Sequence, residues 1–180
     1  CASMWNLGHP VLRYFYEQAT DNDFFVCASS GHGTIFPNQF PELQLFTDDL
    51  NHWLGQSGLN AVSCIQTAPD GLHTLALYNN MSNAKGTIYK SWGDWYWRVG
   101  GAIMSNGKPI KGADYSFWDA SPNNPTVVAD SINGKSRSPL SDLNAYSVVI
   151  IHPWSTNTMD QAAETVSRFQ SHVRVVSIDE

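Results

Sequence analysis

Residues 147–156 read SVVIIHPWST, and this stretch decides the fold class. Its central apolar run has the length and β-branched composition of a strand buried in a parallel sheet, and the proline that follows ends it. Residues 158–170 predict a helix, capped by Asn157 or Thr158, because their apolar residues recur at helical spacing. Residues 173–177 predict the next strand. A strand, a helix and a second strand in succession indicate a right-handed βαβ unit.

The rest of the chain continues this alternation. Apolar residues at helical spacing predict helices at residues 10–19, 41–55, 72–80 and 125–131. Short apolar runs predict strands at residues 23–28 and 60–66. Asn106-Gly107, between two apolar pairs, is a strong signal for a β-hairpin turn. We therefore expect an α/β fold with a mostly parallel sheet, or a barrel-like (β/α) arrangement, with a β-hairpin insertion near residues 101–118.

The size and composition of the chain fit one globular domain. The 180 residues are 42% hydrophobic and 14% charged, and we expect a single α/β domain over residues 1–180. The formal net charge of −6 argues against a nucleic-acid partner, since neutralising phosphates needs clustered Lys and Arg. No apolar run approaches the roughly 20 residues that cross a bilayer, so no membrane span is expected. The chain opens with Cys1, which indicates a processed or cut N-terminus.

The cysteines leave the cellular compartment open. Cys1, Cys27 and Cys64 are an odd number and lack the spacing of metal ligands. Cys27 and Cys64 lie in apolar runs, which favours two buried free thiols, and a disulfide between them requires neighbouring strands. Asn80-Met81-Ser82 matches the N-glycosylation pattern, which matters in a eukaryotic secretory protein.

A second informative stretch, SSGHGTIFP at residues 29–37, directly follows the predicted strand at residues 23–28. Its two glycines and its proline indicate a tight loop at the C-terminal end of that strand. In a parallel sheet all such ends lie at one edge, where α/β proteins build their sites. The polar and aromatic residues expected at this edge are His32, Thr34, Gln66, Asp70, Trp118, Asp119, His152 and Trp154.

The aromatic content favours a sugar ligand. Aromatic residues make up 12% of the chain, and flat aromatic faces stack on sugar rings. We expect half or more of these rings to lie in the core. Trp95, Trp118 and Trp154 are the candidate stacking platforms, and Thr34 is a further candidate for substrate binding.

Ordinary structural interpretations and other chemistries compete with this one. The glycine loop could be a plain turn, and it holds only half of the phosphate-binding pattern G-x-G-x-x-G. His32, His152 and Asp119 could bind zinc or iron, but no H-x-x-H spacing supports a metal. A serine nucleophile is disfavoured because no G-x-S-x-G elbow is present. Cleavage of a glycosidic bond needs two carboxylates, and the candidates are Asp23, Asp94, Asp114 and Asp119.

Several of these segments together resemble the GxGYxYP family of bacterial proteins, which is associated with glycoside hydrolysis. The positions that match the family's motif are Gly31, Gly33 and Pro37. Thr34 and Phe36 stand where the motif has tyrosines, which puts any role of those hydroxyphenyl groups in doubt. Residues 102–118 and 149–154 are also similar to the family. The resemblance implies an α/β domain at the C-terminal end of a longer protein, with carbohydrate as the substrate class.

From the residues and this resemblance we predict a secreted or periplasmic carbohydrate-active protein, a glycoside hydrolase-like domain that acts on poly- or oligosaccharides. Asp119, Asp23 and Asp94 are the acid/base candidates, with His32 and His152 as polar positioning groups. We expect no cofactor and no bound metal, and a further N-terminal domain outside this chain. Two alternatives stay open, a non-catalytic carbohydrate-binding module and a metal-dependent hydrolase or deacetylase.

Overall fold

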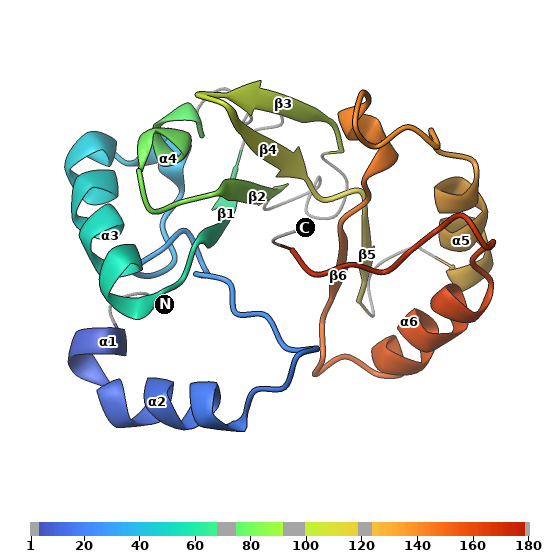
Figure 1. The fold of residues 1–180 in the computed structure, drawn as a ribbon, viewed down its shortest axis with the longest axis horizontal. Coiled ribbons are helices and arrows are strands. Elements are labelled where there is room, and N and C mark those ends of the chain that lie inside the picture. The colour runs from blue at the N-terminus through green and yellow to red at the C-terminus, as the bar shows by residue number, and fades with distance from the viewer. Residues whose placement is uncertain (1–3, 68–74, 92–99, 119–123, 179–180) are drawn as a thin grey trace.

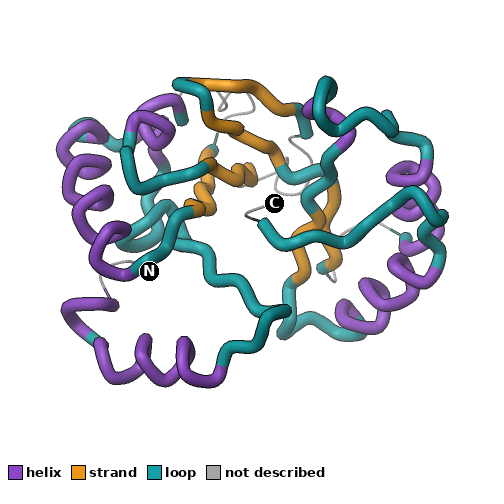
Figure 2. The backbone as a smooth tube through the Cα atoms, viewed as in Figure 1, coloured by secondary structure: helices purple, strands orange, loops and turns teal. Residues whose placement is uncertain are grey.

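The computed structural model describes residues 4–67, 75–91, 100–118 and 124–178. It is a mixed α/β structure with strands at the centre and helices around them (Figure 1, Figure 2). The strands form two sheets, one of four strands in the order β1-β2-β4-β3 and one of two strands, β5 and β6. The predicted α/β class and mostly parallel sheet are confirmed.

The predicted helices are present with bounds that shift by a few residues, whereas α1 and β2 were not predicted. The helices are α1 (Met4–Leu7), α2 (His9–Gln18), α3 (Leu43–Ser57), α4 (Ala76–Asn80), α5 (Pro125–Asn133) and α6 (Thr158–Ser167), with 3-10 turns at Pro37–Gln39 and Leu143–Ala145. The strands are β1 (Ala61–Gln66), β2 (Gly86–Ser91), β3 (Ala102–Ser105), β4 (Lys108–Gly112), β5 (Tyr115–Phe117) and β6 (Val149–Ile151).

The four-stranded sheet is parallel except at one edge. β1 pairs with β2, and β2 pairs with β4, all in parallel register. β3 runs antiparallel to β4 across a turn at Asn106 and Gly107, whose φ values are 50° and 72°. Two successive positive φ values define the type I′ turn that suits the twist of a hairpin. Because β4 also pairs with β2, this hairpin is part of the sheet itself.

The second sheet continues from the first without a helix between them. β4 leads through Ala113 and Asp114 into β5, which pairs in parallel with β6. The backbone N–H of Ala113 donates to Tyr89 O of β2, in the first sheet (2.7 Å). The backbone N–H of the next residue, Asp114, donates to Val148 O, just before β6 of the second sheet (2.9 Å). One extended segment therefore serves both sheets. Over the described residues the strands do not close into a barrel, so the barrel-like alternative is not confirmed.

The two sheets have separate cores. Leu50 and Leu54 of α3 pack on Val62, Cys64 and Tyr89 of the first sheet, and all five are buried. The second core is small and joins Phe117 of β5 to α5 and α6, with Val128 and Ile132 as its buried helical residues. In Figure 1, α3 and α4 lie beside the first sheet, and α5 and α6 lie beside the second.

Two predicted strands differ from the structure. Residues 173–177 form no strand in the structure. The prediction of a strand there is wrong. Of residues 23–28, Cys27 alone forms a β-bridge, parallel to Val62. Apolar composition predicted both runs, but a strand also needs a partner for its backbone groups.

Cys27 and Cys64 are buried free thiols, and burial raises the pKa of the Cys64 thiol. A raised pKa keeps a thiol protonated and unreactive.

Within the described part of the chain, none of the helices has both the length and the apolarity that crossing a membrane requires.

Candidate functional site

Three ring side chains meet at the C-terminal ends of β5 and β6. Trp118 follows β5 and stacks on His152, which follows β6, with ring centroids 4.7 Å apart and an interplanar angle of 30°. Trp154 approaches His152 at 4.0 Å and 60°. We call these three residues the aromatic cluster. Trp154 is 79% exposed, so the cluster presents an open indole face beside a polar ring.

Backbone and hydroxyl contacts hold His152 in place. Its backbone N–H donates to Phe117 O (3.1 Å), which extends the pairing of β5 and β6 by one residue. Its ring nitrogen Nδ1 lies 2.9 Å from the Ser155 hydroxyl. Thr158, the first residue of α6, donates its hydroxyl to His152 O (2.8 Å). The imidazole is therefore held through Nδ1.

The loop at residues 29–37 is anchored to the first sheet. The Ser30 hydroxyl donates to Ile35 O (2.8 Å) and accepts from Ile65 N (3.2 Å), and Tyr78 donates its hydroxyl to Ser30 O (3.1 Å). Gly31 has a φ of +105°, and an added Cβ would lie 2.4 Å from a methyl carbon of Leu50. This glycine serves chain geometry and helix packing.

The same loop turns His32 toward α3. Its ring packs edge-on against Phe46 (5.3 Å between centroids), and Nε2 lies 3.0 Å from the Asp49 carboxylate without hydrogen-bond geometry. Partial burial lowers the pKa of His32, while Asp49 opposes the shift. Thr34 is exposed. The ring and polar contacts of His32 are with α3 and do not include the aromatic cluster.

Asp23 stabilises the turn after α2. Its carboxylate oxygen Oδ2 accepts from the backbone N–H of Thr20 (2.9 Å) and from the Thr20 hydroxyl (2.8 Å). The backbone hydrogen bond, followed by the hydroxyl, lowers the pKa of Asp23. A lowered pKa suits an ionised base or nucleophile and disfavours a general acid, which must hold its proton near neutral pH.

Four predicted site residues, Asp70, Asp94, Trp95 and Asp119, lie outside the described residues. Asp119 is the next residue after Trp118 in the sequence.

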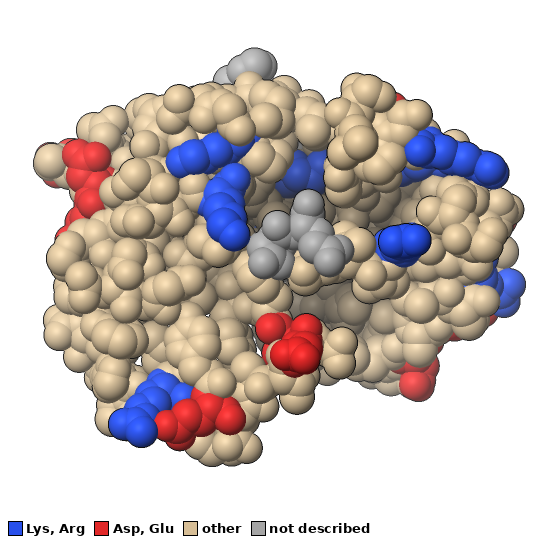
Figure 3. Space-filling view, viewed as in Figure 1, with Lys and Arg blue, Asp and Glu red and all other residues tan. Residues whose placement is uncertain are grey.

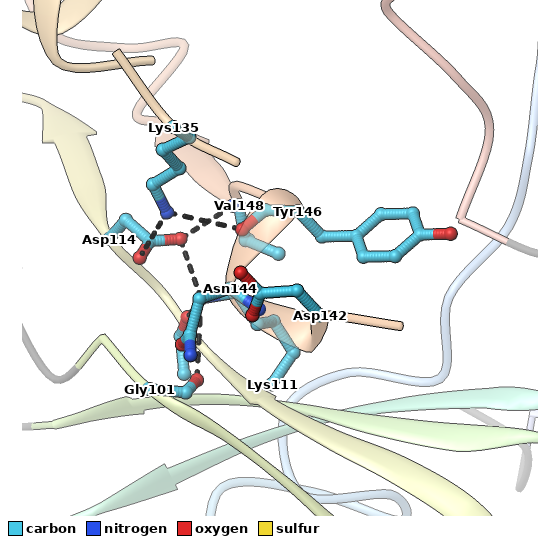
Figure 4. A network of polar contacts seen from close by, with 9 residues as sticks. Gly101, Lys111, Asp114, Lys135, Asp142, Asn144, Tyr146 and Val148 are labelled. Carbon is cyan, nitrogen blue, oxygen red and sulfur yellow. Dashed lines mark hydrogen bonds and ion pairs between the residues drawn. The ribbon is translucent and has the colours of Figure 1, made fainter. Parts of the chain in front are cut away.

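A fourth candidate carboxylate, Asp114, has a structural role at the junction of the two sheets (Figure 4). Its two oxygens form ion pairs with Lys111 (2.7 Å) and Lys135 (3.1 Å), and Oδ2 also accepts from Val148 N (3.0 Å). Lys135 donates in addition to Tyr146 O (3.2 Å). Burial lowers the pKa of Lys111, which the Asp114 carboxylate opposes. The carboxylate is fully engaged, so it is not available as a catalytic acid.

The face seen in Figure 3 is hollowed beside β5 and β6, and acidic side chains lie at the edge of this hollow. Among the residues that the structure describes, no three His, Cys, Asp or Glu side chains gather as metal ligands would. His32 and His152 in particular have separate contacts, with α3 and with the aromatic cluster respectively.

Sequence reasoning missed two parts of this site. Ser155 orients the ring of His152. A hydroxyl residue three positions after a histidine and just before a helix is the sequence pattern that could have indicated this contact. The Lys111–Asp114–Lys135 network had no signal, because Lys135 is 21 residues from Asp114 in the chain. Only the fold brings these charges together.

Comparisons with known proteins place the chain in a family. The family described as "GxGYxYP putative glycoside hydrolase C-terminal domain" matches residues 2–180. A crystal structure of a "putative hydrolase" from Bacteroides thetaiotaomicron VPI-5482 is 27% identical in sequence, with a TM-score of 0.86. The match covers 99% of this chain and 36% of that hydrolase. No curated protein matches the chain.

Proposed function

We propose that this chain, which belongs to the family described as "GxGYxYP putative glycoside hydrolase C-terminal domain", is a carbohydrate-active domain that acts on poly- or oligosaccharides. The predicted family resemblance is thereby confirmed. The similar Bacteroides protein is described as a hydrolase, which supports the same reaction class. A secreted or periplasmic location, where polysaccharides are met, is part of the proposal.

The observation that carries the proposal is the aromatic cluster. Trp154 offers an exposed indole face, and His152, stacked on Trp118, offers a fixed polar nitrogen beside it. Sugars have weakly polar C–H faces that stack on aromatic rings and hydroxyl groups that need hydrogen-bond partners. A stacked ring next to a held imidazole supplies both kinds of contact.

Asp119 is our first candidate for the catalytic carboxylate, since it follows Trp118 directly in the sequence. Asp23 and Asp94 are the candidates for the second. The lowered pKa of Asp23 is compatible with an ionised base or nucleophile but not with a general acid. Hydrolysis would then require a protonated partner, and Asp119→Asn should abolish sugar release.

The deciding experiment is the release of reducing ends from a panel of plant, algal and bacterial polysaccharides by this chain. Release that Asp119→Asn abolishes would support the hydrolase. Trp154→Ala should weaken sugar binding by about 5–10-fold, the worth of one stacked ring. Because Trp154 is 79% exposed, the free energy of unfolding should change by less than about 0.5 kcal/mol.

Tyr14→Ala is the matched control, because Tyr14 is an exposed ring on α2 and lies outside the aromatic cluster. It should leave sugar binding unchanged. Equal dissociation constants for Trp154→Ala and the unmodified chain would remove the cluster from the sugar site.

A non-catalytic carbohydrate-binding module is the second candidate. The ion pairs of Asp114 with Lys111 and Lys135 favour a binding module, because they remove one of the four candidate carboxylates from catalysis. Sugar binding without release from any polysaccharide, unaffected by Asp119→Asn, would identify a binding module.

A further inference from the structure

The tripeptide Asn-Gly-Lys occurs twice in the chain, at residues 106–108 and at residues 133–135. An asparagine followed by glycine can lose its side-chain amide without an enzyme, because glycine has no side chain to hinder the backbone nitrogen that follows the asparagine. That nitrogen attacks the side-chain carbonyl carbon. Since the two tripeptides are identical, their intrinsic reactivity is matched, and the fold decides which of them reacts.

The first tripeptide lies in the turn between β3 and β4, where both Asn106 and Gly107 are exposed. The backbone N–H of Gly107 forms no hydrogen bond with a described residue. Apart from the chain neighbours of Gly107, no described atom lies within 4 Å of the point where its Cβ would stand. The side-chain amide of Asn106 donates one hydrogen bond, from Nδ2 to Asn79 O (3.2 Å). The attacking nitrogen is therefore open to solvent, and a single contact holds the amide that would leave.

The second tripeptide lies at the end of α5, and there each reacting group has a partner. The backbone N–H of Gly134 donates to Asp130 O of the helix (3.0 Å). In the side chain of Asn133, Nδ2 donates to Arg168 O (3.1 Å) and Oδ1 accepts from Gln170 N (2.9 Å). Attack at Asn133 would have to break these hydrogen bonds and separate α5 from the residues that follow α6.

We propose that Asn106 is a site of spontaneous deamidation and that the fold protects Asn133 in the identical tripeptide. The Gly107 nitrogen loses its proton and bonds to Cγ of Asn106, the Cγ–Nδ2 bond breaks, and the amide group leaves with that proton as ammonia. Water then opens the cyclic imide at either carbonyl, which leaves aspartate or isoaspartate at position 106. The reaction needs no oxidant, reductant or cofactor and does not depend on the carbohydrate activity.

Local opening of the chain controls the rate at each site. The φ of 50° at Asn106 belongs to the closed turn, and the backbone must rotate before the Gly107 nitrogen can reach Cγ. Such opening costs less free energy at the exposed tip of a hairpin than at the end of a helix whose side chain joins a second segment. The same argument therefore favours reaction at Asn106 and disfavours it at Asn133.

Deamidation weakens the contact between the hairpin and α4. A carboxylate at position 106 has no N–H to donate, so an oxygen would face Asn79 O in place of Nδ2. Asn79 is fully buried and joins α4 to two strands, because its Nδ2 donates to Lys108 O of β4 (2.8 Å) and its Oδ1 accepts from the Thr87 hydroxyl of β2 (2.9 Å). Isoaspartate would also lengthen the backbone of the turn. The modified hairpin is therefore held less firmly.

The test incubates the folded chain at mildly alkaline pH and follows both tripeptides by peptide mapping with mass spectrometry. We expect Asn106 to deamidate at least about 10-fold faster than Asn133, because the two sites differ in the free energy of local opening. The same chain unfolded in guanidinium chloride is the matched control, in which the two tripeptides should react at similar rates. Equal rates in the folded chain, or a faster reaction at Asn133, would overturn the proposal. A difference of the same size in the unfolded chain would also overturn it, since the flanking sequence and not the fold would then be the cause.

Asn106→Asp tests the consequence for the hairpin separately. Its melting temperature should fall by about 2–4 °C, the shift expected when a domain of this size loses one hydrogen bond. Asn6→Asp is the control, because Asn6 is an exposed residue on α1 and the variant adds the same charge. It should melt within about 1 °C of the unmodified chain. If the two variants melt alike, the contact of Asn106 with Asn79 does not hold the hairpin, and the proposed consequence is overturned.

Discussion

β1 and β6 are both short apolar runs in the sequence, but they have different surroundings in the fold. β1 is buried at five of its six positions and has β2 on one edge and Cys27 on the other. β6 is half-buried to exposed along its length, and over the described residues it pairs with β5 alone. The first half of the molecule closes its own core. The second half keeps an open side, and there the aromatic cluster lies.

This difference teaches where function can be built. A strand covered on both faces contributes stability, whereas a strand with one open side can present the residues at its end to a ligand. Gln66 at the end of β1 is fully buried, whereas Trp154 after β6 is 79% exposed. The half-open sheet is therefore the better place for a site, although its core is the smaller of the two.

The largest expected effect comes from breaking the junction between the two halves. Asp114→Ala leaves a buried charge on Lys111 and a half-buried charge on Lys135 without their partner. We expect the free energy of unfolding to fall by about 3–5 kcal/mol at neutral pH, measured by chemical denaturation. Lys111→Met in the same chain should restore part of the loss, because it removes one unpaired charge. Asp130→Ala is the control, because Asp130 is an exposed carboxylate on α5. If Asp114→Ala lowered the free energy of unfolding no more than Asp130→Ala does, the proposed role of Asp114 would be contradicted.

The contrast between β1 and β6 can be measured directly with two isoleucines. Ile65 in β1 is 3% exposed, and Ile151 in β6 is 36% exposed. Ile65→Ala should cost about 2–4 kcal/mol through lost burial and the cavity that remains. Ile151→Ala should cost about 1 kcal/mol or less, because much of its side chain is already in water. Equal losses in urea titrations would mean that the two strands are equally buried in solution.

A glycine pair tests the packing of the closed half. Gly31→Ala should cost about 2–3 kcal/mol, because the backbone has a positive φ and the new Cβ would collide with Leu50. Gly33→Ala is the control from the same loop, since no atom lies within 4 Å of its added Cβ. Its melting temperature should stay near that of the unmodified chain. If both variants melt alike, the loop is not packed on α3.

The smallest expected effect is a pH dependence within the closed half. Partial burial lowers the pKa of His32 below its ordinary value of 6.5. Between the lowered pKa and 6.5 the unfolded chain binds more protons than the folded one, so stability rises with pH through that window and is level above it. His32→Gln should flatten this part of the stability profile. A profile that keeps its slope in the variant would assign the titration to another group.

The sequence was sufficient for the α/β class and for most of the helices, whereas β2 was not predicted. Periodicity predicted α2, α3 and α6 within a few residues, because the stripe of apolar residues that a helix buries is written in the chain itself. The rule that parallel strands end at one edge predicted that Trp118, His152 and Trp154 lie near one another, and their rings are in contact. That contact depends on strand direction, which the alternation of strands and helices already implies.

The tertiary structure alone decided which apolar runs became paired strands and which side chains serve chemistry or packing. Residues 173–177 have the composition of a strand but form none, and β6 has the composition of a buried strand but is half-buried to exposed. His32 contacts α3, and Asp114 pairs with Lys111, three residues away in the chain, and with Lys135, 21 residues away. Local composition sets what a segment can form, but hydrogen-bond partners, burial and charge pairing depend on residues far away in sequence, and only the folded chain brings those together.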